Sequence, residues 1–182
     1  VVLLTGGLDS CTTLAVAKAR GYAVYAMSFR YGQTHDVEID AARAQAEAVG
    51  VVEHAVVDID MTFDGGSSLV KDSARPAVQD SSIPATYVPA RNTIFLSYAL
   101  AWAEVLEADA IFIGVNAIDY SGYPDCRPQF IQAFERVARV ATRAGVEDRT
   151  QVRIEAPLIH LTKADIIRLA HEHGVDLART HS

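Results

Sequence analysis

The hydrophobic and polar positions of the chain alternate between short apolar runs and longer segments of helical composition. The first run, residues 1–4, has four apolar residues, which predicts a strand that is buried on both faces. Several of the helical segments end at a glycine, a common helix stop. We expect strands at 1–4, 22–30, 51–58, 110–115 and 152–156, and helices at 14–20, 36–49, 93–107, 129–144 and 162–173.

This alternation predicts an α/β fold. Strands separated by helices favour a doubly wound, mostly parallel five-stranded sheet with helices on both faces. We expect a single domain over residues 1–182, because the alternation resumes after the long irregular segment 59–86. A loop of that length is usually functional or mobile. Ligands of such sheets bind outside the carboxyl ends of the strands, so candidate residues are sought there.

Composition narrows the class of protein. Half of the residues are hydrophobic, which indicates a globular chain, and no apolar run approaches the roughly 20 residues of a membrane span. The net charge of −7 and the absence of a basic cluster argue against nucleic acid as a direct partner. The two cysteines form no disulfide framework, so a reducing cytoplasm is expected. Because Val1 already lies in a predicted strand, we expect the natural chain to begin earlier.

A glycine turn follows the first strand, in the order Thr5-Gly6-Gly7-Leu8-Asp9-Ser10. Glycines allow the backbone to approach an anion closely, and the first N–H groups of the next helix point at it. The hydroxyls of Thr5, Ser10, Thr12 and Thr13 are further donors. The turn is therefore a candidate phosphate site, and the alternative is a tight turn that binds nothing.

The turn resembles the Ser-Gly-Gly-x-Asp-Ser motif of the PP-loop ATP pyrophosphatases, with Thr5 in place of the first serine. It is neither a Walker loop nor a Gly-x-Gly-x-x-Gly turn. The resemblance implies ATP and Mg²⁺ as cofactors. The residues it implies for ATP binding are Leu4, Thr5, Gly6, Gly7, Leu8, Asp9, Ser10, Cys11, Thr12, Thr13, Leu14 and Lys163.

Three further motifs make the resemblance more specific: Tyr-Gly-Gln at 31–33, Ile-Pro-x-Thr-x-Val-Pro-x-Arg-Asn at 83–92, and Asp-x-Ser-Gly-Tyr-Pro-Asp-Cys-Arg at 119–127. Together they resemble the 7-cyano-7-deazaguanine synthase family, the PP-loop enzymes of queuosine biosynthesis. The family implies an ATP-dependent ligase that converts 7-carboxy-7-deazaguanine and ammonia to the nitrile, through an acyl-adenylate and an amide.

The resemblance and the residue types together give a substrate side of the site. Arg91 suits bidentate binding of a carboxylate or phosphate, and Asp119 and Asp125 are acceptors for the donor-rich face of a deazaguanine. The alternatives are a surface arginine and turn-forming aspartates. The expected substrate contacts are Tyr31, Gln33, Arg91, Asn92, Asp119, Ser121, Tyr123, Asp125 and Arg127, and the expected catalytic residues are Ser10, Arg91 and Lys163.

The roles of Lys163 and of the two cysteines each have an alternative interpretation. Lys163 opens a helix at the capping box Thr162–Asp165, where the dipole disfavours a cation unless an anion is bound, and the alternative is a solvated side chain. Cys126 is interpreted as lining the pocket rather than as a nucleophile, because no base is adjacent. Cys11 is expected to pack on the first helix. The family has a four-cysteine zinc cluster near its C-terminus, so Zn²⁺ is expected only in a segment that this chain lacks.

Two other classes of function stay open. One is another PP-loop enzyme, either a tRNA thiolation enzyme or an amidating synthetase, although thiolation would require a basic face and catalytic cysteines. The other is a non-catalytic nucleotide-binding module with a similar fold, which would not need the 119–127 segment. The expected partners are small molecules, without a membrane, and a homodimer is left open.

Overall fold

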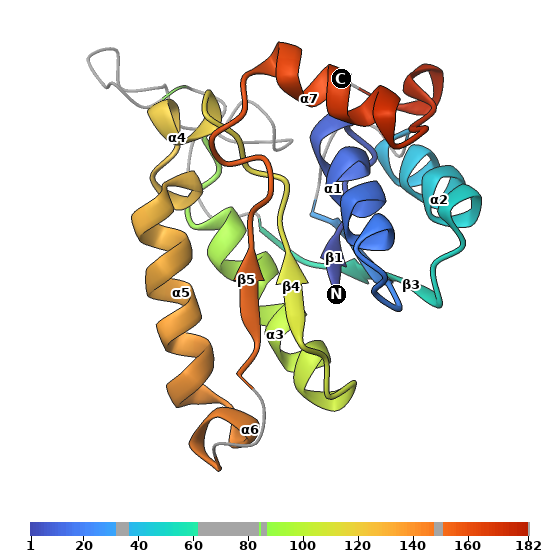
Figure 1. Cartoon of the computed structure of the whole chain (residues 1–182). Helices are drawn as coiled ribbons and strands as arrows, with labels where there is room; N and C mark the ends of the chain where they lie inside the picture. The colour runs from blue at the N-terminus through green and yellow to red at the C-terminus, as the bar shows by residue number, and fades with distance from the viewer. Residues whose placement is uncertain (32–36, 62–83, 85–86, 148–150, 182) are drawn as a thin grey trace.

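The structure is a computed structural model that describes residues 1–31, 37–61, 84, 87–147 and 151–181. Its centre is a five-stranded sheet with the order β3-β2-β1-β4-β5, in which every pair of neighbours is parallel (Figure 1). The predicted fold class is therefore confirmed. The strands are β1 (Val2–Leu3), β2 (Tyr25–Arg30), β3 (Glu53–Asp58), β4 (Ala110–Phe112) and β5 (Arg153–Glu155).

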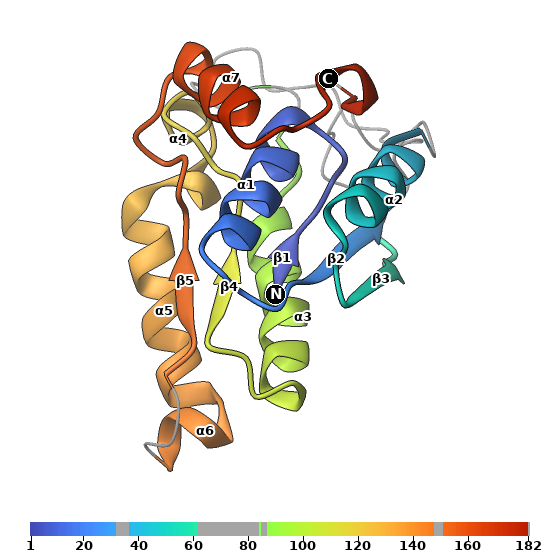
Figure 2. The ribbon, with the colours of Figure 1, turned by 45° about the vertical axis from the view of Figure 1, so that its right-hand side comes forward.

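Helices cover both faces of this sheet (Figures 1 and 2). On one face lie α1 (Leu8–Ala19) and α2 (Val37–Val49), and on the other lie α3 (Arg91–Val105) and α5 (Pro128–Ala141). The helix α7 (Lys163–Glu172) packs against α1. The short elements are α4 (Asp119–Gly122), the 3₁₀ turn η1 (Pro124–Cys126), α6 (Arg143–Val146) and the 3₁₀ turn η2 (Leu177–Arg179).

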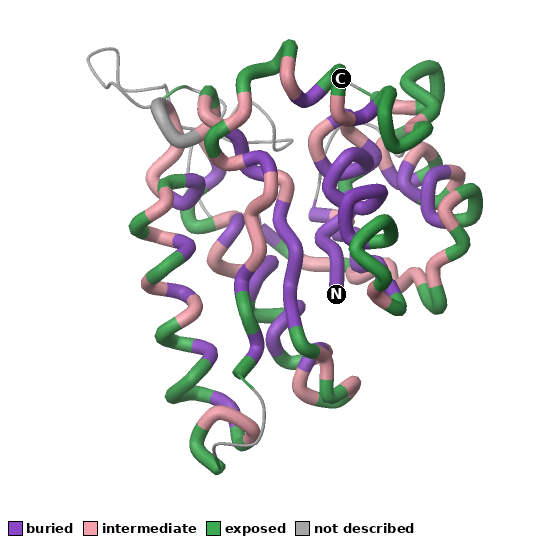
Figure 3. The backbone as a smooth tube through the Cα atoms, viewed as in Figure 1, coloured by how far each residue is buried: buried purple, intermediate pink, exposed green. Residues whose placement is uncertain are grey.

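Strand β1 explains why the sheet needs cover on both sides. Successive side chains of a strand point to opposite faces. Leu3 packs into the cluster beneath α3 and α5, whereas Val2 and Leu4 pack into the cluster beneath α1 and α2. All three are buried, as is most of α1 and β4 (Figure 3). The unbroken apolar run at the start of the chain thus reflects a strand with two buried faces.

The helix boundaries differ most from the predicted ones at two places, and elsewhere they differ by one or two residues. Helix α1 begins at Leu8 rather than at residue 14, because Gly7 is its N-cap and Thr12 and Thr13 are buried within it. The predicted helix 129–144 ends at Ala141, where the Thr142 hydroxyl donates to Ala138 O and accepts from Gly145 N to start α6. A polar hydroxyl run resembles a turn in sequence, yet here it is helical and buried.

The strand order reverses between β1 and β4. β1 is followed in sequence by β2 on one side, whereas β4 pairs with its other edge. In open parallel sheets, ligands bind at such a reversal, outside the carboxyl ends of the strands. The glycine turn follows β1 there, and the 119–127 segment follows β4, so the topology brings the two predicted halves of the site to one edge.

Candidate functional site

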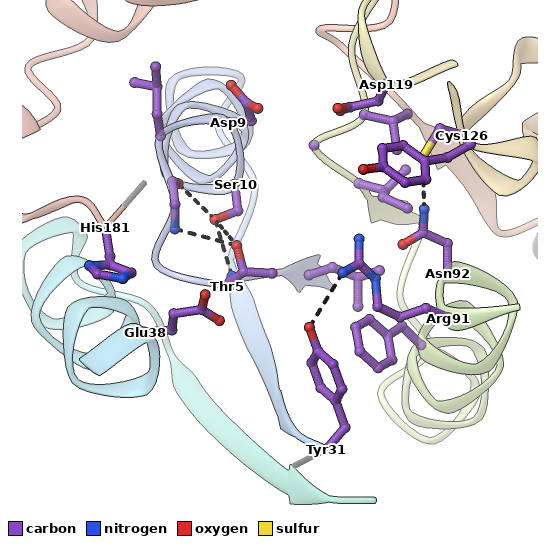
Figure 4. A pocket seen from close by; sticks show the side chains of 18 of the residues that line it. Thr5, Asp9, Ser10, Tyr31, Glu38, Arg91, Asn92, Asp119, Cys126 and His181 are labelled. Atoms are coloured by element: carbon purple, nitrogen blue, oxygen red, sulfur yellow. Dashed lines mark hydrogen bonds between the residues drawn. The ribbon is translucent and has the colours of Figure 1, made fainter. Parts of the chain in front are cut away.

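A pocket of about 450 Å³ lies at this edge of the sheet. Its lining comes from the glycine turn, the chain after β4, the first turns of α2, α3 and α7, the 119–126 segment and the end of the described chain. Figure 4 shows Thr5, Asp9 and Ser10 on one side of it and Arg91, Asn92 and Cys126 on the other. The predicted nucleotide and substrate residues therefore face a common space.

The glycine turn is held by two hydroxyls. Ser10 Oγ accepts from Thr5 N at 3.1 Å and donates to Gly7 O at 2.9 Å, so Thr5 Oγ1, 3.0 Å away, donates to Ser10. Gly7 is the N-cap residue of α1 and makes no side-chain hydrogen bond to the helix. The first N–H groups of α1 are therefore available to a ligand. With the dipole of α1 behind them, these groups make the turn suited to an anion.

Gly6 is the position where only glycine fits. Its φ is +83°, and an added Cβ would lie 2.3 Å from the carbonyl oxygen of Glu38 and 2.9 Å from the backbone nitrogen of Ala42. The first turn of α2 therefore rests directly on the turn. On the opposite side, His181 N donates to Gly6 O at 3.0 Å, so the end of the described chain is also fixed there.

Lys163 reaches the site from α7. Its Nζ lies 3.0 Å from Oδ1 and 3.2 Å from Oδ2 of Asp9, in an ion pair at the rim of the pocket. The predicted capping box holds the start of α7, since Thr162 Oγ1 accepts from Asp165 N and Asp165 Oδ2 accepts from Thr162 N. The Thr162 hydroxyl, which also donates to Asp165 Oδ2, lowers the pKa of Asp165 to about 2, together with the Thr162 N–H and Arg168. The lysine is thus poised on a firmly capped helix.

Arg91 and Asn92 begin α3 on the substrate side. The carboxylate of Asp125 accepts from Asn92 N at 2.9 Å, and Asn92 Nδ2 donates to Asp125 O at 3.0 Å and to Cys126 Sγ at 3.2 Å. No side chain at Ala90 caps the helix, so Asp125 does this from a distant segment. Asp125 is buried and outside the pocket lining, which makes it a support for the helix start.

The Arg91 guanidinium gives this wall a positive charge. Its Nη1 donates to the hydroxyl of Tyr31 at 3.4 Å. Burial alone would lower its pKa, but Tyr31, Asp125 and Cys126 raise the pKa of Arg91 above its ordinary value, so the side chain stays charged. A half-buried cation that lines a pocket suits an anionic ligand.

Asp119 lies between the two halves. It opens α4, and its carboxylate accepts from Asn116 N at 3.3 Å, while Asn116 Nδ2 donates to Asp9 at 3.1 Å. Burial and the charge of Asp9 raise the pKa of Asp119, against the opposing effects of the Asn116 N–H, Lys163 and Arg91. The site thus holds a carboxylate that takes up a proton more readily than an ordinary aspartate.

Neither cysteine has the environment of a nucleophile. Burial, followed by Asp125 and Asp119, raises the pKa of Cys126 to about 12, and burial raises the pKa of Cys11 to about 12. Cys126 lines the pocket, as predicted, and Cys11 packs in the core under α1. Both are free thiols, and at neutral pH both are protonated.

The structure brings most of the predicted residues together and places others elsewhere. The predicted residues that line the pocket are Thr5, Gly7, Leu8, Asp9, Ser10, Tyr31, Arg91, Asn92, Asp119, Tyr123 and Lys163. Those outside the lining are Leu4, Gly6, Cys11, Thr12, Thr13 and Leu14, which are buried beneath the turn, and Asp125 and the exposed Arg127. Gln33 and the side chain of Ser121 lie outside the described residues.

Sequence reasoning missed four notable lining residues: Glu38, Phe95, Gly114 and His181. Gly114 had a visible signal, since it interrupts an apolar run. An added Cβ there would lie 3.0 Å from the backbone of Asp9 and Ser10, so its small size lets the chain after β4 pass close to α1. Glu38, Phe95 and His181 follow from tertiary packing and carry no motif.

Comparisons with known proteins identify the family. The family model described as "Queuosine biosynthesis protein QueC" matches residues 1–182. The chain belongs to the QueC family. It is 61% identical over 183 residues to the 7-cyano-7-deazaguanine synthase of Geobacter metallireducens, with 100% of this chain and 77% of the relative covered. It is 59% identical over 187 residues to that of Desulfatibacillum aliphaticivorans, covering 100% and 80%. The chain is thus an enzyme of this family.

Solved structures share the fold of this chain at low sequence identity. One neighbour is the NMN synthetase of Francisella tularensis, with a TM-score of 0.59 and 15% identity, covering 98% of this chain and 62% of that chain. Another is described as a predicted subunit of tRNA methyltransferase from Methanocaldococcus jannaschii, with a TM-score of 0.58 and 20% identity, covering 94% and 73%. At such identities the likeness concerns the fold alone.

Two absences hold for the residues that the structure describes. Among these residues, no group of three or more His, Cys, Asp or Glu side chains is placed to hold a metal ion. None of the helices described is both long and apolar enough to cross a membrane.

Proposed function

We propose that this chain is an ATP-dependent 7-cyano-7-deazaguanine synthase that activates 7-carboxy-7-deazaguanine by adenylation. One observation carries the proposal: a single pocket is lined by the glycine turn with Lys163 on one side and by the Arg91 cation on the other. A reaction between ATP and a carboxylate needs two anion-binding groups that face one another, because the two anions must be brought together.

The nucleotide half is the turn Thr5–Ser10 with Lys163. The N–H groups at the start of α1 and the hydroxyls of Thr5 and Ser10 are proposed to bind the β- and γ-phosphates. Lys163 would then exchange its Asp9 partner for the leaving pyrophosphate, which lowers the barrier by neutralising developing charge. The α-phosphorus is left open toward Arg91.

The acid half is proposed to bind the deazaguanine. Arg91 would hold the substrate carboxylate, with the Tyr31 hydroxyl fixing the guanidinium. Asp119 would accept from the amino and ring N–H groups of the base, and Tyr123 would stack on its face. Asn92 and Asp125 support this wall through the start of α3. The contacts expected from Gln33, Ser121 and Arg127 remain part of the proposal.

The chemistry follows in two activations. The substrate carboxylate attacks the α-phosphorus, and pyrophosphate leaves from the turn. Ammonia adds to the acyl-adenylate, and AMP leaves with the bonding electrons while a proton is released. The amide oxygen is adenylated by a second ATP in the same way, and loss of AMP and a proton leaves the nitrile. Arg91 positions the carbonyl carbon, and Lys163 and the turn stabilise each departing pyrophosphate.

Mg²⁺ fits this arrangement as a companion of ATP. It is usually held by one or two carboxylates together with phosphates, and Asp9 is the carboxylate that pairs with Lys163 beside the turn. Bound there, it would supply charge neutralisation at the phosphates. The proposal assigns no role to zinc in residues 1–182. We further propose a cytoplasmic location, where ATP is available, with small molecules as the only substrates.

The decisive experiment follows the label of α-³²P ATP in single-turnover reactions with the acid and ammonia. AMP and pyrophosphate are expected, together with an acyl-adenylate at early times and the nitrile at the end. Label in ADP, with no AMP at any time, would rule out adenylation. An amide that accumulates without nitrile would favour an amidating synthetase, and unchanged ATP with or without the acid would indicate a binding module.

A further inference from the structure

We propose that Glu38 is the ribose-binding residue of the ATP site, accepting hydrogen bonds from the 2′- and 3′-hydroxyls. Glu38 lies in the first turn of α2 and lines the pocket. Its carboxylate makes no hydrogen bond or ion pair with the residues that the structure describes. Figure 4 shows it beside Thr5, near the imidazole of His181. A half-buried, acceptor-only group that lines the pocket is suited to donors from a ligand.

The position of Glu38 is fixed by backbone contacts with the phosphate cradle. Because Gly6 has no side chain, the carbonyl of Glu38 approaches to 2.3 Å from where a Cβ at Gly6 would lie. Gln45, further along α2, donates through Nε2 to Asp176 O at 2.9 Å, which ties the helix to the segment ending at His181. The glutamate therefore keeps a constant relation to the turn that is proposed to hold the phosphates.

Charge sets the direction in which ATP lies. Asp9, with its partner Lys163, and Glu38 stand on opposite sides of Thr5 and Ser10 (Figure 4). The triphosphate has acceptors alone, so Lys163 attracts it and the carboxylate of Glu38 repels it. The donors of ATP are the ribose hydroxyls and the adenine amino group. The ribose is joined directly to the α-phosphate, so it is the donor group nearest the turn.

Topology supports the same assignment. Glu38 follows β2, the strand next to β1, at the carboxyl edge of the sheet. In the Rossmann fold, a related doubly wound sheet, an acidic residue beyond the glycine turn binds a ribose hydroxyl. This inference rests on the proposed use of ATP, and it adds the orientation of the nucleotide and a basis for choosing ribonucleotides over deoxyribonucleotides.

The test compares ATP, 2′-deoxyATP and 3′-deoxyATP in the wild type and in Glu38→Gln, by kcat/KM for nitrile formation and by calorimetric binding of each nucleotide. The matched control is Glu47→Gln, an exposed glutamate on the same helix outside the pocket. The wild type and the control are expected to prefer ATP by about 10- to 100-fold, the strength of hydrogen bonds to a charged acceptor. Glu38→Gln is expected to lose this preference by weakening ATP alone.

Other outcomes overturn the inference without touching the proposed function. Equal use of ATP and both deoxynucleotides by the wild type would refute it, even if the variant failed to fold. Purine riboside triphosphate lacks the adenine amino group. If the wild type and Glu47→Gln prefer ATP to this analogue but Glu38→Gln does not, Glu38 binds the base instead of the ribose. If high Mg²⁺ restored the kcat/KM of Glu38→Gln, Glu38 would be assigned to metal binding instead. If the wild type bound no ATP, the proposed function itself would fail.

Discussion

The hydroxyl of Ser28 donates a hydrogen bond to the carbonyl oxygen of Leu4 over 2.5 Å. Ser28 is fully buried on β2, and its Oγ lies 2.7 Å from Nε2 of His54 on β3. Since the only hydroxyl proton goes to Leu4, His54 is the donor to Ser28. Leu4 is the last residue before the glycine turn, so two neighbouring strands fix the point at which the turn leaves the sheet.

Ser28→Ala should therefore lower the free energy of unfolding by about 1–3 kcal/mol, because the Leu4 carbonyl and the His54 N–H both lose their partner. His54→Ala should be less damaging, since the bond from Ser28 to Leu4 remains. Urea denaturation of both variants measures the difference. A larger loss in His54→Ala than in Ser28→Ala would contradict the assigned direction of these bonds.

Substitutions at Gly6 and at Gly7 should impair different properties, stability in the first case and ATP binding in the second. Gly6→Ala places a Cβ 2.3 Å from the Glu38 carbonyl at a φ of +83°, so we expect a loss of about 2–5 kcal/mol of stability. Gly50→Ala, with a φ of +68° and no atom within 4 Å, is the control for strain without crowding and should cost about 1 kcal/mol. Thermal unfolding would show whether crowding at Gly6 matters.

Gly7→Val should instead fold and lose ATP. Gly7 has an ordinary φ of −79°, and an added Cβ would lie 3.3 Å from His181 O, a contact that a small shift relieves. A side chain there would nevertheless obstruct the proposed phosphates. Nucleotide binding by calorimetry, with circular dichroism for the fold, checks this. Normal ATP affinity in a folded Gly7→Val protein would contradict the proposal that the turn binds the phosphates.

Lys163→Met should lower kcat/KM for ATP by about 10- to 1,000-fold, the range for loss of one charge-stabilising group. Its ion pair with Asp9 is half-exposed, so stability should change by less than about 1 kcal/mol. Lys18→Met, at the far end of α1, removes a lysine that, among the described residues, donates only to the Gly50 carbonyl, and it should leave activity unchanged. Equal activities of the two variants would exclude Lys163 from the chemistry.

The pH profile should report on Asp119. Burial and the charge of Asp9 raise the pKa of Asp119, so its ionised form is lost on acidification at a pH above the ordinary aspartate value of about 3.9. We expect kcat/KM for the acid to fall as the pH drops through this raised pKa. Asp119→Asn should remove that acidic limb, whereas the exposed Asp40→Asn should keep it. An unaltered profile in Asp119→Asn would assign the limb to another group.

Cys126→Ala should retain activity within a few-fold, and the wild-type thiol should resist iodoacetamide at pH 8, because a pKa of about 12 leaves almost no thiolate. Mass spectrometry of the alkylated protein locates any modification. Loss of all turnover in a folded Cys126→Ala protein would reinstate the thiol as a participant.

The sequence predicted the fold, and it predicted that the glycine turn and Lys163 lie together, because both predictions rest on local patterns. The run before Thr5, the paired glycines and the capping box at Lys163 each span a few residues, and their positions in the sheet follow from parallel topology. The structure revised the substrate half, where Asp125 caps α3 through Asn92 across 33 residues of sequence. No local pattern distinguishes such a cap from a ligand contact, and no periodicity places Glu38 against Gly6.

The pairing of Lys163 with Asp9 spans 154 positions of the chain. During synthesis, the turn and all five strands emerge from the ribosome before α7 does, and the sheet has its full set of partners without that helix. The nucleotide half is therefore completed last. An unfinished chain could therefore form the sheet and the Arg91 side of the pocket first, and with the role proposed for Lys163 it would use ATP only after translation had passed that residue.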